Sequence, residues 1–168
     1  MAHRLQLETD CKEKIMNAID LLKEDHDRVD RLFQKVQATQ EGEHMDLFEQ
    51  IYQELEVHTH IEETIFYPQI KEGGDEELQK LTAEAVEEHR QAKMFLRELN
   101  AMKNEGERFE AKLKVLMEDI KHHVQEEEGQ MFPMIQKQFD EYTLQTLGQE
   151  LEKEKQKFQK SHKASSGR

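Results

Sequence analysis

Tryptophan is absent from this sequence, and cysteine, proline and glycine are scarce: the 168 residues include one cysteine, two prolines and seven glycines. The single cysteine, Cys11, excludes a disulfide framework within one chain and fits a reducing compartment. With so few prolines and glycines, little interrupts helices, and the abundant Glu, Lys, Gln and Leu favour them. The composition therefore predicts an all-α protein.

Long apolar runs are also missing. No window approaches the length of a transmembrane helix, and residues 1–14 contain no apolar run that resembles a secretion signal. Hydrophobic residues make up 35% of the chain and charged residues 36%, which is typical of helices with narrow buried stripes and wide solvated faces. We expect one soluble, cytoplasmic domain with its own core and no membrane partner.

Positive charge is in deficit, because 24 lysines and arginines face 37 aspartates and glutamates, for a formal net charge of −13. This balance argues against nucleic acid or an anionic membrane as the main partner. It is compatible with the attraction of cations, although the solubility of an acidic surface explains it equally well.

Apolar residues repeat at helical spacing in four long segments. We expect helices from about residue 10 to 38, from 44 or 45 to Pro68, from about 75 to 104 and from about 109 to Pro133. Four amphipathic segments with short connections predict an antiparallel up-down four-helix bundle with a short C-terminal fifth helix. The expected divisions are a lead (1–14), the bundle domain (15–140), a C-terminal helical segment (141–160) and a disordered tail (161–168).

Two stretches of the chain are near copies of each other, "EVHTHIEETIFYP" and "KHHVQEEEGQMFP". Each half of the chain carries a histidine, then a His-x-x-x-Glu pair, then a proline: His26, His58, Glu62 and Pro68, followed by His89, His123, Glu127 and Pro133. The two histidines are 32 and 34 residues apart, and the proline follows the second histidine by 10 residues in both halves. Each half is therefore predicted to be one helical hairpin.

Helical geometry separates the inward residues of each stretch from the outward ones. At about 100° per residue, Glu62 lies about 40° from His58 within the apolar stripe, whereas His60 and Glu63 fall about 160° and 140° away. The same calculation rotates two residues of the second stretch away from the stripe: His122 and Glu128. We therefore expect four histidines and two glutamates to face one core: His26, His58, Glu62, His89, His123 and Glu127.

Two buried, ionised glutamates require compensation, because an unpaired charge in a core is costly and two carboxylates repel each other. Lys93, four residues after His89, is one base against two acids. A pair of divalent metal ions resolves the problem, since carboxylates can bridge two metals while imidazoles fill terminal positions. Nitrogen and oxygen ligands without thiolate suit iron, with manganese and zinc as alternatives.

These residues resemble the hemerythrin-like HHE cation-binding domain family, whose pattern is a histidine followed by His-x-x-x-Glu, written twice. The flanking phrases "LLKEDHDRVDRLF", "EEHRQAKMFLREL", "HIEETIFYP" and "EEEGQMFP" are similar as well, and the resemblance covers roughly residues 15–157. It implies a non-haem centre of two Fe ions that binds or reacts with O2, peroxide or NO. The implied metal ligands are the six inward residues: His26, His58, Glu62, His89, His123 and Glu127.

The sequence departs from the oxygen-carrying hemerythrins, which have a His-x-x-x-His pair on the third helix and an aspartate near the end of the fourth. Here Lys93 stands four residues after His89, and Glu127 replaces the aspartate arrangement. Fewer histidines and more carboxylates favour the ferric state. The resemblance therefore points to sensing, redox response or iron handling rather than reversible oxygen carriage.

The sequence leaves other hypotheses for the function open. They are a di-iron enzyme with catalase-like or oxidase activity, a protein for metal storage or buffering, and a plain helical bundle without metal. Two further residues are candidates to assist the site: Asp30, one turn after His26, and Tyr52, as a phenolate ligand in a distorted helix. Tyr67 lies about 180° from His58 on a regular helix and is expected to pack or to face the surface.

Overall fold

The chain folds into helices throughout the residues that the computed structural model describes, 16–166, with side chains described up to residue 162. The elements are α1 (Ala18–Ala38), α2 (Met45–Ile61), η1 (Glu62–Phe66), α3 (Tyr67–Gly73), α4 (Glu76–Asn100), α5 (Glu107–Glu126), η2 (Glu127–Met131), α6 (Phe132–Gln138) and α7 (Glu141–Ser166). The two η elements are single π-helical turns. The expected lead, 1–14, lies outside the described residues.

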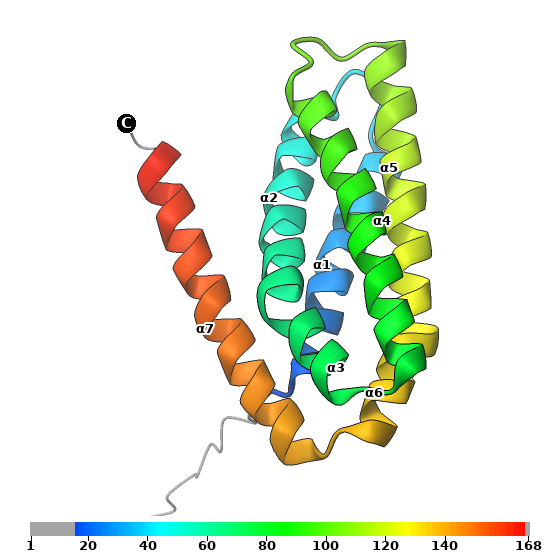
Figure 1. Cartoon of the computed structure of the whole chain (residues 1–168). Helices are drawn as coiled ribbons and strands as arrows, with labels where there is room; N and C mark the ends of the chain where they lie inside the picture. The colour runs from blue at the N-terminus through cyan, green and yellow to red at the C-terminus, as the bar shows by residue number, and fades with distance from the viewer. Residues whose placement is uncertain (1–15, 167–168) are drawn as a thin grey trace, which may run out of the picture.

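Helices α1, α2, α4 and α5 form the predicted antiparallel four-helix bundle (Figure 1). Helix α1 begins later than predicted, at Ala18, because the Asn17 side chain caps it by accepting a hydrogen bond from the backbone N–H of Asp20. Asp75 caps α4 in the same way through the N–H of Leu78. Short connections join α1 to α2 and α4 to α5, so the bundle consists of two helical hairpins.

Both His-x-x-x-Glu helices widen into a π-helical turn at the glutamate. Pro68 and Pro133 follow closely at the starts of α3 and α6. Since proline has no N–H and its ring clashes with the carbonyl four residues earlier, a regular α-helical turn cannot continue through it. The backbone N–H of Tyr67 instead donates to the carbonyl of Glu62, five residues back, which changes the direction of every later side chain.

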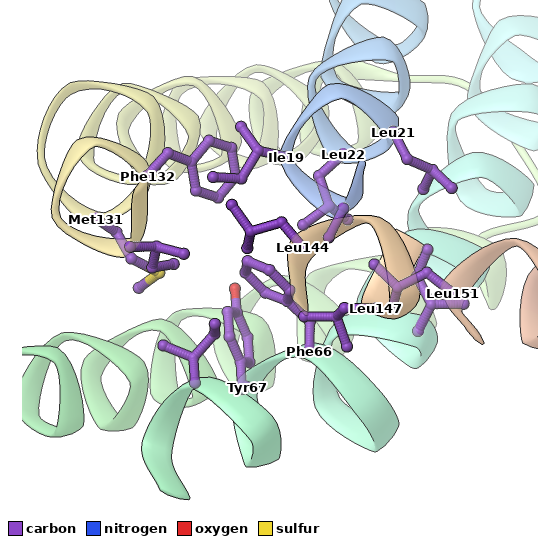
Figure 2. Close-up of a cluster of buried hydrophobic side chains, with 14 of the residues drawn as sticks. Ile19, Leu21, Leu22, Phe66, Tyr67, Met131, Phe132, Leu144, Leu147 and Leu151 are labelled. Atoms are coloured by element: carbon purple, nitrogen blue, oxygen red, sulfur yellow. The ribbon is translucent and has the colours of Figure 1, made fainter. Parts of the chain in front are cut away.

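The apolar core has two parts, separated along the bundle by a layer of buried polar residues. The lower core lies where α3, α6 and α7 meet and includes Phe66, Phe132, Leu144 and Leu147 (Figure 2). The upper core lies toward the α1–α2 and α4–α5 connections and contains Phe33 and further residues of all four long helices. In α1, His26 lies between the residues that join the lower core and those that join the upper core.

Helix α7 differs from the short fifth helix that the sequence suggested. It has 26 residues and continues to Ser166, through positions expected to belong to a disordered tail. Gly148 allows α7 to approach the start of α1, because a Cβ there would collide with the backbone of Met16 and Asn17. Toward its C-terminal end α7 diverges from the bundle (Figure 1). None of the helices in the described range is long and apolar enough to cross a membrane.

Candidate metal centre

The structure brings all six predicted ligand residues together in the polar layer between the two cores. They come from every long helix of the bundle and from the first positions of both π turns: His26 (α1), His58 (α2), Glu62 (η1), His89 (α4), His123 (α5) and Glu127 (η2). None is more than 5% exposed. The helical periodicity of the sequence therefore identified a set of side chains that meet in three dimensions.

The four histidines form two pairs, one in each hairpin. The rings of His26 and His58 have centroids 4.9 Å apart, and the Nε2 atoms of His89 and His123 are 3.1 Å apart. Each pair can thus offer two imidazole nitrogens to one cation.

The two glutamates lie between the histidine pairs. Glu62 Oε2 is 3.2 Å from Nε2 of both His58 and His89, which belong to different pairs. Glu127 Oε2 is 3.2 Å from His26 Nε2 and 3.5 Å from His123 Nε2, so it also reaches both pairs. This arrangement suits two metal positions with two carboxylates shared between them.

The donor atoms fit a metal better than they fit one another. In the described part of the chain, six buried side-chain nitrogen or oxygen atoms lack a hydrogen-bond partner, and five of them belong to predicted ligands. They include Nε2 of His26 and of His58 and one oxygen each of Glu62 and Glu127. Buried polar atoms normally have partners, so these atoms are expected to bind a cation. Imidazole and carboxylate donors without thiolate match iron, manganese or zinc.

The outer nitrogen of each histidine faces a further carboxylate. The four Nδ1-to-oxygen distances are 2.7 Å for His26 and Glu128, 3.6 Å for His58 and Asp25, 3.1 Å for His89 and Glu63, and 2.6 Å for His123 and Glu88. Such partners fix the ring orientation and direct Nε2 to the metal. Glu63 and Glu128 do point away from the centre, as predicted, yet they hold histidines of the opposite hairpin.

These partners were not predicted from the sequence. Asp30, the candidate for holding His26, is exposed and accepts a hydrogen bond from Gln34 instead. A signal was nevertheless available, because an acidic residue precedes the first histidine of both halves and a second acid follows both ligand glutamates. The prediction failed because partners across helices depend on how the hairpins pack.

Tyr67 is the main correction to the predicted site. It was expected to pack or to face the surface, but it is buried and its hydroxyl lies 2.6 Å from Glu127 Oε1 and 3.2 Å from Glu62 Oε2. The same oxygen is 3.3 Å from His89 Nε2. The prediction assumed a regular α-helix, whereas the π turn rotates Tyr67 into the line of Glu62.

Tyr52, the other tyrosine considered, lies away from the centre. Its ring packs against Phe48, and burial together with the Glu56 carboxylate raises the pKa of its hydroxyl to about 12. It is therefore a packing residue rather than a phenolate donor.

Charge in the centre is balanced by protonated imidazole when no metal is bound. Burial lowers the pKa of His58, but the Glu62 and Asp25 carboxylates outweigh it and raise the pKa to about 10. Burial alone would raise the pKa of Glu62, yet the His58 and His89 rings hold the pKa well below its usual value. Lys93, the predicted lone base, pairs with Glu63 at 2.6 Å rather than with the inner glutamates.

Two histidines of the repeated stretches stay outside the centre, as the helical geometry predicted. His60 is half-buried and lies 2.9 Å from Glu154 of α7, and His122 is exposed and lies 3.3 Å from Glu126.

Fold and site together define a metal-cation-binding four-helix bundle with clusters of buried histidines and glutamates as candidate ligands. The sequence profile described as "Hemerythrin HHE cation binding domain" matches residues 17–135. The chain belongs to this family.

A solved structure supports the assignment. It is a crystal structure of a hemerythrin HHE cation binding domain-containing protein from Mycobacterium kansasii, and it is 26% identical with a TM-score of 0.74. The similarity covers 87% of this chain and 89% of that one. A curated protein of Nostoc sp., named DNA nickase, is 26% identical over 148 residues. This match covers 86% of the present chain but only 40% of that protein.

Proposed function

We propose that the protein holds two iron ions in this centre and that the centre binds or reacts with O2, peroxide or NO, in sensing, redox response or iron handling. The observation that carries the proposal is that each buried glutamate lies beside one histidine of both pairs. One carboxylate within reach of two imidazole pairs is the arrangement expected of a bridging ligand. The iron supplies the capacity to change oxidation state and to accept a small ligand.

The residues of the chain have separate tasks in this proposal. The four inner histidines and the two glutamates hold the metals, and the outer carboxylates keep the imidazoles oriented. The hydroxyl of Tyr67 also contacts this set. Burial and the Glu127 and Glu62 charges raise the pKa of Tyr67 well above its ordinary value, so the phenol keeps its proton and donates it.

Metal analysis and optical spectroscopy test the proposal. Protein loaded anaerobically with Fe(II) and exposed to air should contain two irons per chain and show ferric charge-transfer absorption that reduction bleaches. Peroxide, NO and O2 added to the reduced protein should change that spectrum. Freely exchangeable metal with no response to these ligands would favour storage or buffering, and protein that retains no metal would contradict the proposal.

Catalase-like activity is the second candidate, favoured by the position of Tyr67. A phenol 2.6 Å from a ligand carboxylate is placed to deliver a proton to a substrate in the centre. Tyr67→Phe should then slow peroxide turnover by about 100-fold with unchanged iron content. An equal turnover rate in the variant would contradict a role for Tyr67 in catalase-like activity.

We further propose a small molecule, rather than nucleic acid, as the partner of this chain, despite the name of the Nostoc relative. The net charge of −13 opposes binding to the phosphate backbone. Iron-loaded protein should leave supercoiled plasmid intact at low salt, where non-specific binding is strongest. Nicking by the wild type that disappears in Glu62→Ala would overturn this part of the proposal.

A further inference from the structure

The His89 and His123 pair is accessible from outside through a cavity between α4 and α5. The cavity has a volume of about 200 Å³, and both histidines contribute to its wall together with Glu88, Asp119 and His122. His89 and His123 are only 1% and 3% exposed, so the cavity reaches side chains that are otherwise buried.

Three potential metal ligands converge beside this cavity, and two of them, Glu88 and His122, line it. Glu88, His122 and Glu126 each offer one ligand atom, and these atoms all lie within 4.8 Å of one another. His122 and Glu126 are one helical turn apart on α5, with Nε2 and Oε1 3.3 Å apart, and their side chains are 66% and 42% exposed. Because a histidine joins the two carboxylates, the cluster offers more than acidity: imidazole nitrogen and carboxylate oxygen suit Fe²⁺, Mn²⁺, Co²⁺ and Zn²⁺.

The cluster is directly connected to the buried centre. Glu88 belongs to it, and Oε2 of the same residue lies 2.6 Å from Nδ1 of His123. A second, small cavity of about 10 Å³, room for roughly one water molecule, has Glu88 and Glu126 of the cluster in its wall together with His123 and Glu127 of the centre. One oxygen of Glu127 is buried without a hydrogen-bond partner. Carboxylates therefore continue from the surface to the inner ligands.

In the described part of the chain, neither lysine nor arginine neutralises the negative charge of the cluster. Among the residues that the structure describes, no lysine or arginine nitrogen forms an ion pair with Glu88 or Glu126. Two of the other three outer carboxylates do have such bases: Glu63 pairs with Lys93 at 2.6 Å, and Asp25 pairs with Arg28 at 2.6 Å. The third, Glu128, has an ion pair only with His26 among the described residues. The surface next to His123 combines a carboxylate that has no lysine or arginine partner with a second carboxylate and an imidazole, and this combination suits it to attract and bind a cation.

Another cavity near the centre is less suited to attract a cation. It lies between α2, α4 and α7, has a volume of about 220 Å³ and includes Glu63 in its wall. Lys93 and Arg97 also line it, so a cation that approached Glu63 from this side would meet two positive charges.

We propose that Glu88, His122 and Glu126 form a loading site, which binds a divalent cation first and passes it to the buried centre beside His89 and His123. The inference rests on the proposed function only in requiring that the buried centre take up metal. A negatively charged cleft raises the local concentration of cations and their rate of association. Exposed ligands bind a cation weakly, so the cation can be transferred to the buried centre, which offers more ligands.

Kinetics of metal uptake test the loading site. Metal-free protein is mixed anaerobically with Fe(II) or Co(II), and the rise of the metal spectrum is followed by stopped flow. The double variant His122→Ala/Glu126→Gln should load about ten-fold more slowly or worse, yet reach the same final metal content and spectrum as the wild type. Uptake by the wild type should also slow as salt is added, and uptake by the variant should depend on salt much less.

A matched control removes another surface His–Glu pair by the same substitutions. His60 and Glu154 lie 2.9 Å apart between α2 and α7, away from the loading site, and His60→Ala/Glu154→Gln should load at the wild-type rate. Equal loading rates in the wild type and in His122→Ala/Glu126→Gln would overturn the inference. A comparable slowing in the control would also overturn it, because the effect would then not be specific to the loading site.

Equilibrium binding separates this inference from the proposed function. In Glu62→Ala/Glu127→Ala, which removes the inner carboxylates, one weak Co(II) site per chain should remain and should disappear when His122→Ala/Glu126→Gln is added. Loss of all Co(II) binding in Glu62→Ala/Glu127→Ala would contradict the loading site but would not contradict the proposed two-iron centre of the wild type. Normal loading-site binding in a wild-type protein that fails to retain inner iron would instead contradict the proposed function.

Discussion

The two hairpins of the bundle carry equivalent ligands in different surroundings. Each provides two histidines and one glutamate, and in each the residue before the first histidine holds the second: Asp25 for His58 and Glu88 for His123. Asp25, however, is covered by α7, whose buried Lys155 forms an ion pair with it. Glu88 borders a cavity and the exposed His122.

A second difference lies one π turn after each glutamate. Tyr67 follows Glu62 and donates to both inner carboxylates, whereas Phe132 follows Glu127 and stacks on His26 with centroids 5.9 Å apart. The duplicated sequence therefore supplies two similar histidine pairs. The residues around them cover the first pair, His26 and His58, and leave a cavity and polar groups beside the second, His89 and His123. Similar ligands do not imply similar chemistry at the two pairs.

The largest expected effect comes from the two glutamates that each adjoin both histidine pairs. Glu62→Ala and Glu127→Ala should each abolish stable binding of both metals, because each glutamate adjoins both histidine pairs. Metal content of the purified, reconstituted variants is the measurement. The control variants His60→Ala and His122→Ala should keep full stoichiometry, and a glutamate variant that retained one firmly bound metal would show that its carboxylate is a terminal ligand of the other.

The next effect should distinguish the two outer carboxylates. Lys155→Met leaves the buried Asp25 with His58 and the half-exposed Arg28 as its remaining bases, and loss of one partner from a buried ion pair should lower the free energy of unfolding by roughly 3 kcal/mol. Glu88→Gln, in the accessible half, should cost about 1 kcal/mol. Urea unfolding of the metal-free proteins measures both changes. Equal losses of stability would contradict the difference between Asp25, which α7 covers, and Glu88, which borders a cavity.

A smaller effect on stability is expected at Tyr67, which is replaced by Phe132 in the second half of the chain. Tyr67→Phe removes the hydroxyl donor from the buried Glu127 and Glu62 carboxylates, which should lower the stability of the metal-free protein by about 1–2 kcal/mol. Tyr52→Phe, a half-buried tyrosine outside the centre, should change it by less than about 0.5 kcal/mol. Thermal unfolding at constant pH gives the comparison, and indistinguishable variants would mean that the Tyr67 hydroxyl has no energetic role without metal.

The last expected effect concerns pH rather than a substitution. The folded-state pKa of His58, about 10, lies above the unfolded value near 6.5, so the contribution of His58 to stability is complete below pH 6.5 and is lost as pH rises toward 10. Metal-free protein should accordingly be less stable at pH 9 than at pH 6, and His58→Gln should flatten this dependence. Metal affinity should change in the opposite direction, because binding displaces the proton. Calorimetric titrations in buffers of different ionisation enthalpy will count the protons released.

Most of the fold could be predicted from the sequence. The 3.6-residue periodicity of apolar residues identified the four long helices, and the doubled His-x-x-x-Glu motif identified two hairpins. The length of α7 was underestimated, because its C-terminal part has few apolar residues to mark a helix. All six inner residues were found because each lies in the apolar stripe of its own helix, which is local information.

The residues around the inner six were missed for physical reasons. Tyr67 was placed wrongly because a π turn changes the rotation per residue, and the wheel assumed a constant value. Glu63 and Glu128 were rotated away from the centre correctly, but the rings that they orient belong to the other hairpin. Lys155 escaped notice because it stands in a charged run of α7 that reads as solvent-exposed.

The sequence by itself determined the helices, their pairing into hairpins and the six donors at the centre, because these follow from periodicity along single helices and from the repeat. Only the tertiary structure decided which half is covered, where Tyr67 donates and where the surface opens toward His123. These features depend on the local widening of two helices and on contacts between segments more than 100 residues apart, such as Asp25 and Lys155. Periodicity within one helix carries no information about either.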